Sequence, residues 1–305
     1  MIQDSKSWNE TTYYYDIIQI PVNTFCQGLN SLVASIEEYI VNTVEHLILA
    51  CVLYVALCIL LYLAATRWKL FTFTRDMRNA RRILFVTAHP DDEVMFFGPT
   101  LMHYAQKQNC TVYLLCLSSG KNYGMDKIRT NELFESCKLL GMEQENVFVY
   151  NNTNLPDSMD VRWPLELVSK HILYYVEAFD ITNLVTFDRY GISGHPNHCS
   201  IYYAVANLVI DRQLPKNCGV FVLESVNIFR KYWLVLDLPL SLILSRFRYM
   251  KGFSQRKVIH RAMRKHKSQM VWFRRLYMCV SRYMLINTLQ QMNLVDIELD
   301  LELED

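Results

Sequence analysis

The segment Ile83-Leu-Phe-Val-Thr-Ala-His-Pro-Asp-Asp-Glu93 joins an apolar run to a histidine and three consecutive carboxylates. Its Ile, Val and Phe residues predict a buried strand, because β-branched and aromatic side chains pack well on a pleated surface. A proline ends the run, so His89 to Glu93 are expected in a loop at the carboxyl edge of a sheet. Such loops hold the ligands and catalytic groups of many α/β proteins. Taken alone, the segment fits a catalytic loop and a solvated acidic turn about equally well.

A second polar cluster, Asp188-Arg-Tyr-Gly-Ile-Ser-Gly-His-Pro-Asn-His198, also follows an apolar run, at residues 184–187. Its two histidines are three residues apart at the start of a predicted helix, residues 197–210, which would direct both to one side. Two histidines and an aspartate from two strand-end loops form a three-ligand set typical of a catalytic zinc, with one position open to water. A structural zinc would need four ligands, usually cysteines, and the sequence has no Cys-x-x-Cys.

Three motifs resemble those of the PIG-L/LmbE family of zinc-dependent N-acetylglucosaminide deacetylases: Ala88-His-Pro-Asp-Asp-Glu93, Arg129-x-x-Glu132-Leu and Gly194-His-Pro-Asn-His198. The resemblance is closest to the eukaryotic membrane branch, whose members remove acetate from N-acetylglucosaminyl-phosphatidylinositol in GPI-anchor biosynthesis. It covers residues 80–290, including Ser268-Gln-Met-Val-Trp-Phe-Arg-Arg-Leu-Tyr277.

The resemblance implies both a reaction and a site. The reaction is hydrolysis of the N-acetyl group of that glycolipid. The implied cofactor is Zn²⁺ or another divalent metal, with the ligands His89, Asp92 and His198. The other implied roles are a general base, Asp91, an oxyanion stabiliser or acid, His195, and a sugar-binding group, Arg129, beside the glycine-containing loop 118–124.

Three other functions share parts of this pattern. A deacetylase of another, soluble N-acetylated glycoside would use the same site but would not need a membrane anchor. A membrane-anchored glycosyltransferase would use Asp91 and Asp92 to hold the metal of a sugar nucleotide, yet His195 and His198 suit zinc better than Mg²⁺ or Mn²⁺. A non-catalytic adaptor would be expected to lack part of the ligand set, and the set is complete.

Residues 47–66 are twenty consecutive residues without a charge, the length that a helix needs to cross a bilayer. Six basic residues follow within residues 67–82, whereas Lys6 is the only one before the stretch. The positive-inside rule therefore predicts a single-pass membrane protein with a cytoplasmic catalytic domain. The family resemblance implies the endoplasmic reticulum membrane, so that the N-terminus would be lumenal. Residues 25–44 show the helical period of an amphipathic lead-in helix.

After residue 82, predicted strands alternate with predicted helices. The strands are expected at residues 82–88, 111–117, 147–150, 184–187 and 219–223, and the helices at residues 127–140, 164–178, 197–210 and from Pro99 onward. This alternation predicts a Rossmann-like three-layer α/β/α sandwich with a mostly parallel sheet, preceded by one transmembrane helix. The sequence contains no Gly-x-Gly-x-x-Gly, so a nucleotide is not implied.

The chain is expected to have five parts: a lumenal segment (1–46), the transmembrane helix (47–66), a basic juxtamembrane linker (67–81), the deacetylase domain (82–290) and an acidic tail (291–305), disordered or loosely docked. Residues 232–245 fit a membrane-dipping hairpin and a packed core segment about equally. Residues 246–282 hold twelve Lys or Arg and no acid, interleaved with aromatics. Beside a membrane anchor this pattern favours anionic lipid head groups over nucleic acid as the partner. The sequence identifies no protein partner.

Overall fold

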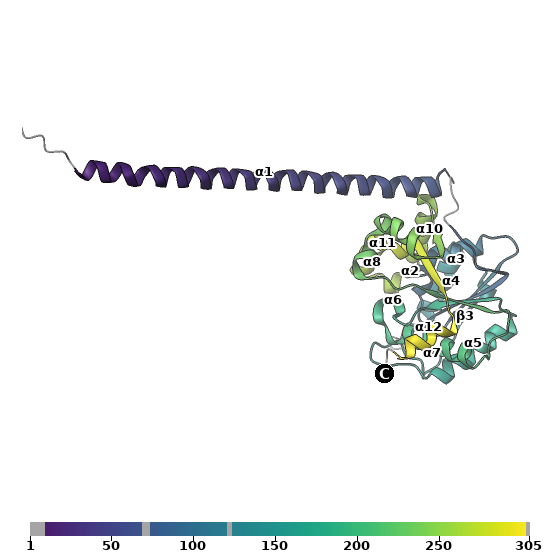
Figure 1. Ribbon diagram of the computed structural model, residues 1–305. Coiled ribbons are helices and arrows are strands. Elements are labelled where there is room, and N and C mark those ends of the chain that lie inside the picture. Colours follow the sequence, from purple (N-terminus) through teal and green to yellow (C-terminus); the bar gives the residue numbers. More distant parts are fainter. Residues whose placement is uncertain (1–9, 69–73, 121–123, 303–305) are drawn as a thin grey trace, which may run out of the picture. The chain divides into compact units, whose positions relative to one another are not determined.

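The computed structural model describes residues 10–68, 74–120 and 124–302 (Figure 1). The chain divides into two units, Met1–Leu57 and Cys58–Asp305. The described part of the first unit is helical and belongs to α1 (Glu10–Thr66). Within α1, Thr24–Thr66 is long and apolar enough to cross a membrane. The predicted lead-in helix and the predicted span are therefore parts of one continuous helix.

The second unit is organised around a seven-stranded sheet, with strand order β3-β2-β1-β4-β5-β7-β6. The first five strands are parallel: β1 (Arg82–Thr87), β2 (Thr111–Cys116), β3 (Val147–Val149), β4 (Asn183–Phe187) and β5 (Gly219–Leu223). The strand β7 (Ile286–Gln291) runs antiparallel to both of its neighbours, β5 and β6 (Phe247–Met250). All five predicted strands are confirmed, and the two C-terminal strands were not predicted.

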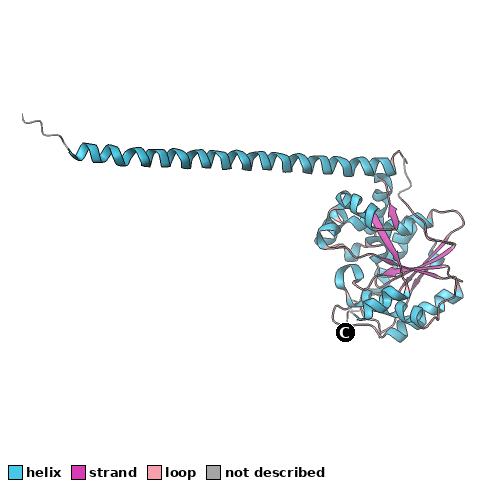
Figure 2. Cartoon of the chain, in the orientation of Figure 1, coloured by secondary structure: helices cyan, strands magenta, loops and turns pink. Residues whose placement is uncertain are grey.

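Helices cover both faces of this sheet, so the predicted three-layer sandwich is confirmed (Figures 1 and 2). One face carries α5 (Leu165–Ala178), α7 (Pro196–Ile210) and α12 (Leu294–Glu302). The other carries α2 (Asp92–Met95), α3 (Gly98–Ala105), α4 (Asp126–Leu140) and α10 (Phe253–Met263). The short helices near the sheet's carboxyl edge are α6 (Gly191–Gly194), α8 (Ile228–Tyr232), α9 (Leu238–Leu244) and α11 (Trp272–Val280), and the 3₁₀ turns are η2 (Gln144–Asn146), η3 (Leu234–Asp237), η4 (Lys267–Gln269) and η5 (Arg282–Met284).

Local signals explain where individual helices begin and end. Pro99 lies in the first turn of α3, where its missing N–H would have no partner within the helix. Gly141 ends α4 in the left-handed conformation, with φ 96°. Its N–H donates to the Lys138 carbonyl and the next N–H donates to the Cys137 carbonyl, which satisfies two carbonyls at the end of the helix.

The C-terminal third differs from the expectation of one basic surface over residues 246–282. Phe247 and Tyr249 are buried core residues of β6, because alternate side chains of that strand face inward. Arg282 is fully buried and pairs with the equally buried Asp237, Nε to Oδ2 at 3.0 Å. The aromatic and basic residues of this segment are thus divided between the core and the surface.

The expected loose acidic tail is also more ordered than its composition indicates. It begins with the last residue of β7 and continues as α12 after a short turn. Ile297 of α12 is fully buried and Met292 is nearly so, and both belong to the main hydrophobic core. The alternation of acids with Ile and Leu therefore marks an amphipathic helix that packs on the domain.

Candidate metal centre and active site

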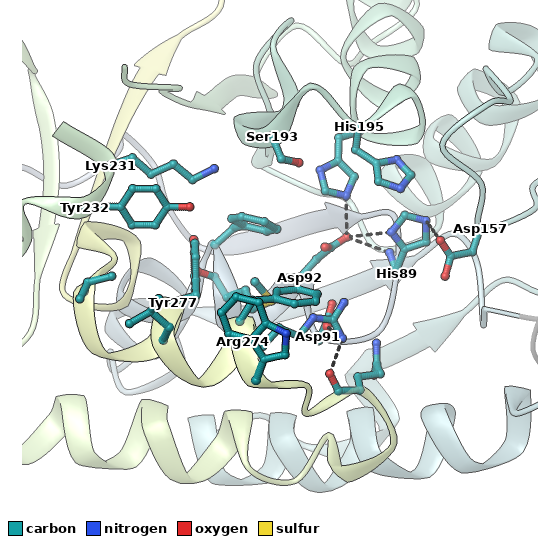
Figure 3. Close-up of a pocket in the computed structure, with 18 residues that line it drawn as sticks. His89, Asp91, Asp92, Asp157, Ser193, His195, Lys231, Tyr232, Arg274 and Tyr277 are labelled. Carbon is teal, nitrogen blue, oxygen red and sulfur yellow. Dashed lines mark hydrogen bonds and ion pairs between the residues drawn. The ribbon is translucent and has the colours of Figure 1, made fainter. Parts of the chain in front are cut away.

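The loop after β1 turns sharply and separates two adjacent aspartates. Asp91 has φ 103°, a left-handed conformation that costs a non-glycine residue about 1–3 kcal/mol. The Oδ2 atom of Asp92 accepts hydrogen bonds from the backbone N–H groups of Ala88 (3.0 Å) and His89 (2.8 Å). As a result Asp92 faces the histidines, whereas Asp91 faces Arg274 (Figure 3).

His89, Asp92 and His198 come together as a buried cluster whose candidate ligand atoms lie within 4.8 Å of one another. Asp92 Oδ2 lies 3.4 Å from His198 Nε2 and 3.8 Å from His89 Nδ1. The opposite ring nitrogens are already engaged: His198 Nδ1 lies 3.0 Å from the Gly191 carbonyl, and His89 Nε2 lies 3.0 Å from Asn197 Oδ1. Such outer contacts fix the ring orientation and leave the inner nitrogen available to a metal.

This cluster fits a divalent metal on chemical grounds. Imidazole nitrogens and a carboxylate oxygen are preferred ligands of Zn²⁺. The His198 Nε2 atom is buried and makes no well-formed hydrogen bond within the described residues. A buried polar atom without a partner is costly, and a bound metal would satisfy it.

A second group of side chains, His89, Asp157 and His195, also meets the distance requirement for a metal. Two of its members are engaged elsewhere. Asp157 Oδ2 accepts a hydrogen bond from Arg129 Nη1 at 2.9 Å, and the His89 nitrogen that faces Asp157 also contacts Asn197. The group that contains Asp92 is therefore the better metal site. No sequence motif indicated Asp157, which lies in a loop outside the quoted motifs.

The charges of the site perturb its carboxyl groups in opposite directions. Burial raises the pKa of Asp91 to about 7, although Arg274 lowers it in part, and Asp92 raises it further. Burial alone would raise the pKa of Asp92 too, but the neighbouring His198 and His89 outweigh it and hold that pKa below its ordinary value. Two adjacent aspartates thus have different proton affinities, as expected where one binds cations and the other exchanges a proton.

His195 lies on the cavity wall, with its ring centroid 4.8 Å from that of His89. Burial, together with His89 and His198, lowers the pKa of His195 to about 4, so its ring is neutral near pH 7. Its Nδ1 atom accepts a hydrogen bond from the Asn197 N–H at 3.2 Å. In the neutral ring the proton is then on Nε2, which makes this nitrogen a donor.

Arg129 is close to the site but lies behind Asp157. Gly120 has φ 76°, a conformation that favours glycine, and a Cβ atom there would displace the Arg129 side chain, because it would come within 2.1 Å of Nη1. Glu132 of the same motif accepts hydrogen bonds from Ser268 and not from Arg129 in the contacts of the described residues. Residues 121–123 of the loop 118–124 lie outside the described residues.

A cavity of about 470 Å³ opens beside these groups, with Asp91, Asp92 and the histidines on one wall. The opposite wall is apolar and is formed largely by α11, with Trp272, Phe273, Leu276, Tyr277 and Val280. Figure 3 shows Tyr232 and Lys231 closing a further side. Trp272, Phe273, Leu276 and Tyr277 lie in the motif 268–277, but none of these wall residues was predicted as a site residue.

A buried network behind the loop holds it in position. His266 Nε2 lies 2.7 Å from Glu93 Oε1, and both side chains are fully buried. The same oxygen accepts a hydrogen bond from Ser136 Oγ (2.7 Å), and the other carboxylate oxygen accepts the Asp91 N–H (2.9 Å). Gln269 Nε2 donates to the Pro90 carbonyl at 2.6 Å. Glu93 is therefore a structural support of the loop.

Comparison with known proteins identifies the family of this chain. Residues 84–209 match the family model PIG-L: GlcNAc-PI de-N-acetylase. The chain is 47% identical over 210 residues to N-acetylglucosaminyl-phosphatidylinositol de-N-acetylase of Bos taurus, covering 68% of this chain and 82% of that protein. It is 31% identical over 251 residues to the Saccharomyces cerevisiae protein of the same name, covering 67% and 79%.

Among solved structures, N,N'-diacetylchitobiose deacetylase from Pyrococcus horikoshii aligns with a TM-score of 0.53 and 16% identity, over 76% of this chain and 91% of that chain. At this identity the likeness shows the fold alone. The resemblance inferred from the three sequence motifs is confirmed by the family model and by relatives that align over most of their own length. This chain belongs to the PIG-L family of N-acetylglucosaminyl-phosphatidylinositol de-N-acetylases.

Proposed function

We propose that this chain hydrolyses the N-acetyl group of N-acetylglucosaminyl-phosphatidylinositol to give glucosaminyl-phosphatidylinositol and acetate, an early step of GPI-anchor biosynthesis. The observation that carries the proposal is a buried three-ligand cluster beside a carboxyl group of raised pKa, on the polar wall of a half-apolar cavity. The relatives named for this reaction support the choice of substrate.

The proposed metal ligands are His89, Asp92 and His198. A Zn²⁺ ion, or another divalent metal, held there would polarise the acetamide carbonyl and ease ionisation of the attacking water. The unsatisfied His198 Nε2 and the outer contacts that orient both histidines support this assignment.

Asp91 is the proposed general base. A pKa of about 7 suits a group that accepts the proton of water and passes it to the leaving amine near neutral pH. Arg274 Nη1, 2.7 Å from Asp91 Oδ2, orients the carboxylate and limits the rise of its pKa.

His195 is the proposed oxyanion stabiliser. Its neutral ring carries the proton on Nε2, and a preoriented donor in a buried site stabilises the negative charge that develops on the amide oxygen. The low pKa favours this role over that of a general acid.

The sugar end of the substrate is proposed to contact Asp157, which lines the cavity, with Arg129 holding that carboxylate in place. This modifies the sequence-based expectation that Arg129 itself binds the sugar. The same ion pair fixes the orientation of Asp157, whose Oδ1 lies 3.3 Å from His89 Nε2.

The proposed location is the endoplasmic reticulum membrane, with residues 1–46 lumenal and residues 82–290 cytoplasmic. One apolar helix and the six basic residues that follow it support this arrangement. Residues 67–81 would serve as the juxtamembrane linker, and residues 291–305 as an acidic C-terminal segment.

The direct test is a mass-spectrometric assay of the purified full-length protein with N-acetylglucosaminyl-phosphatidylinositol in liposomes. The expected result is a deacetylated glycolipid and an equal amount of acetate, both abolished by a chelator and restored by Zn²⁺. A protein that leaves this glycolipid intact but deacetylates a soluble N-acetylated glycoside would contradict the proposed substrate.

A further inference from the structure

An exposed apolar rim lies beside the mouth of the catalytic cavity. It consists of six large side chains on three short helices, each more than half exposed: Ile228 and Phe229 on α8, Ile243 and Leu244 on α9, and Trp272 and Phe273 on α11. Helices α8 and α11 lie side by side, with the rings of Tyr232 and Tyr277 6.4 Å apart (Figure 1). Apolar side chains grouped in this way on a protein surface mark an interaction site.

The rim adjoins the end of the apolar stretch that is predicted to span the membrane. Within the second unit, Leu61, Tyr62 and Ala65 of α1 pack on the cluster that contains Leu238 of α9. Cys58 is fully buried, and its Sγ lies 3.9 Å from the Leu236 carbonyl of η3. The last nine residues of α1 are thus packed against η3 and α9.

Because of this packing, the depth of η3 and α9 in a bilayer follows from the depth of residues 58–66. A helix needs about 20 uncharged, mostly apolar residues to cross a bilayer. Among the described residues, only residues 47–66 form a stretch of that length that is both uncharged and strongly apolar. A shift toward the N-terminus would place Glu45 in the hydrocarbon, which is costly. With residues 47–66 as the span, residues 58–66, about 13 Å of helix, would lie in the leaflet nearer the domain, together with the elements packed on them.

We propose that the apolar rim inserts into the cytoplasmic leaflet, so that the mouth of the cavity opens onto the membrane and a lipid-linked substrate enters while its acyl chains stay in the bilayer. The identity of that substrate rests on the proposed function, whereas the insertion does not. The rim is built from short helices, whose terminal backbone groups would lie at the level of the polar head groups while the apolar side chains enter the leaflet.

The charge around the rim agrees with an anionic leaflet as the partner. Lys257 and Arg261 of α10, with Arg264 directly after it, line a second cavity of about 730 Å³, and its lining includes no acid among the described residues. The N-terminus of α10 lies at the end of α1, since a Cβ atom on Gly252 would be 3.6 Å from Thr66 Cβ. Basic residues at this level attract anionic head groups.

The first test is site-specific photo-crosslinking of the full chain in liposomes of phosphatidylcholine and phosphatidylinositol. p-Benzoylphenylalanine replaces Phe229 or Ile243 in the rim, and Tyr174 on α5 as a control of similar exposure. The expected result is lipid adducts at positions 229 and 243 and none at position 174. Adduct yields at 229 and 243 no higher than at 174 would overturn the insertion, and this readout does not depend on any enzymatic activity.

The second test separates insertion from catalysis. The double variant Phe229→Glu/Ile243→Glu should lower kcat/KM for the glycolipid in liposomes by about tenfold or more, because two side chains lose apolar burial in the bilayer. Its activity on the acyl-free head group, N-acetylglucosaminyl-inositol phosphate, should equal that of the wild type. Equal loss on both substrates would overturn the proposal, whereas a wild type inactive on both would instead refute the proposed function.

Discussion

Arg274 Nη1 lies 2.7 Å from Asp91 Oδ2 and 2.8 Å from the Gln269 carbonyl, so one guanidinium joins the apolar wall of the cavity to the carboxylate on its polar wall. Asp91 is nearly fully buried, and its carboxylate forms an ion pair with Arg274. Helix α11 therefore forms the apolar wall of the cavity and also, through Arg274, positions the proposed base Asp91.

Replacing Arg274 by Gln should lower kcat by about 100-fold, because a proton acceptor displaced by about 1 Å loses most of its effectiveness. Metal content, measured by mass spectrometry of the purified protein, should not change. Arg275→Gln, at the exposed neighbouring position, is the charge-matched control and should retain normal kcat. A normal kcat for the Arg274 variant would show that this ion pair does not position the base.

Asp91→Asn should retain the metal and lose turnover, because an amide cannot accept the proton of water. The variant keeps the size of the side chain, so the loop should keep its conformation. Metal content and single-turnover rate are measured on the same sample. Turnover near that of the wild type would remove Asp91 from the role of base.

His198→Ala and His89→Ala should each abolish activity and lower the bound metal, since each removes one of three proposed ligands. His195→Ala is the matched control, because it removes a third histidine from the same cavity and should leave the metal in place. If the His195 variant lost the metal and the His198 variant kept it, the metal would belong to the group that contains Asp157.

Much of this fold followed from local patterns, and the site followed from motifs. The five parallel strands are short apolar runs bounded by turn residues, so the sequence indicates them directly. The strand at Phe247–Met250 was hidden because Arg248 alternates with aromatics within a basic run. Asp157 and the Arg230–Asp237–Arg282 cluster depend on contacts between distant segments, which no short pattern reveals.

The proposed topology can be tested by adding a protease to intact microsomes. The six basic residues after residue 66, against Lys6 alone before residue 47, predict that the catalytic domain is digested and the N-terminal segment is spared. Detection with one tag at each end of the chain distinguishes the two products, and detergent should expose both. Protection of the C-terminal tag in intact microsomes would reverse the orientation.

His266→Ala should destabilise the domain in a pH-dependent way. Burial lowers the pKa of His266, but Glu93, 2.7 Å away, raises it more, so the folded-state pKa lies above the unfolded value of about 6.5. The pair therefore contributes fully below about pH 6.5, and its contribution is lost as the pH rises through the folded-state pKa. Breaking such a buried pair costs about 3–5 kcal/mol.

The measurement is the apparent Tm of the full chain in detergent, for the wild type and the His266 variant, at about pH 6, below the unfolded pKa, and at about pH 9, well above it. The difference in Tm should be larger at the lower pH. Ser136→Ala is the control, because it removes a neutral hydrogen bond of 2.7 Å to the same Glu93 oxygen, worth about 1 kcal/mol, and should shift Tm equally at both pH values. If the two variants showed the same pH dependence, the His266–Glu93 contact would not act as an ion pair, and Glu93 would support the catalytic loop through hydrogen bonds alone.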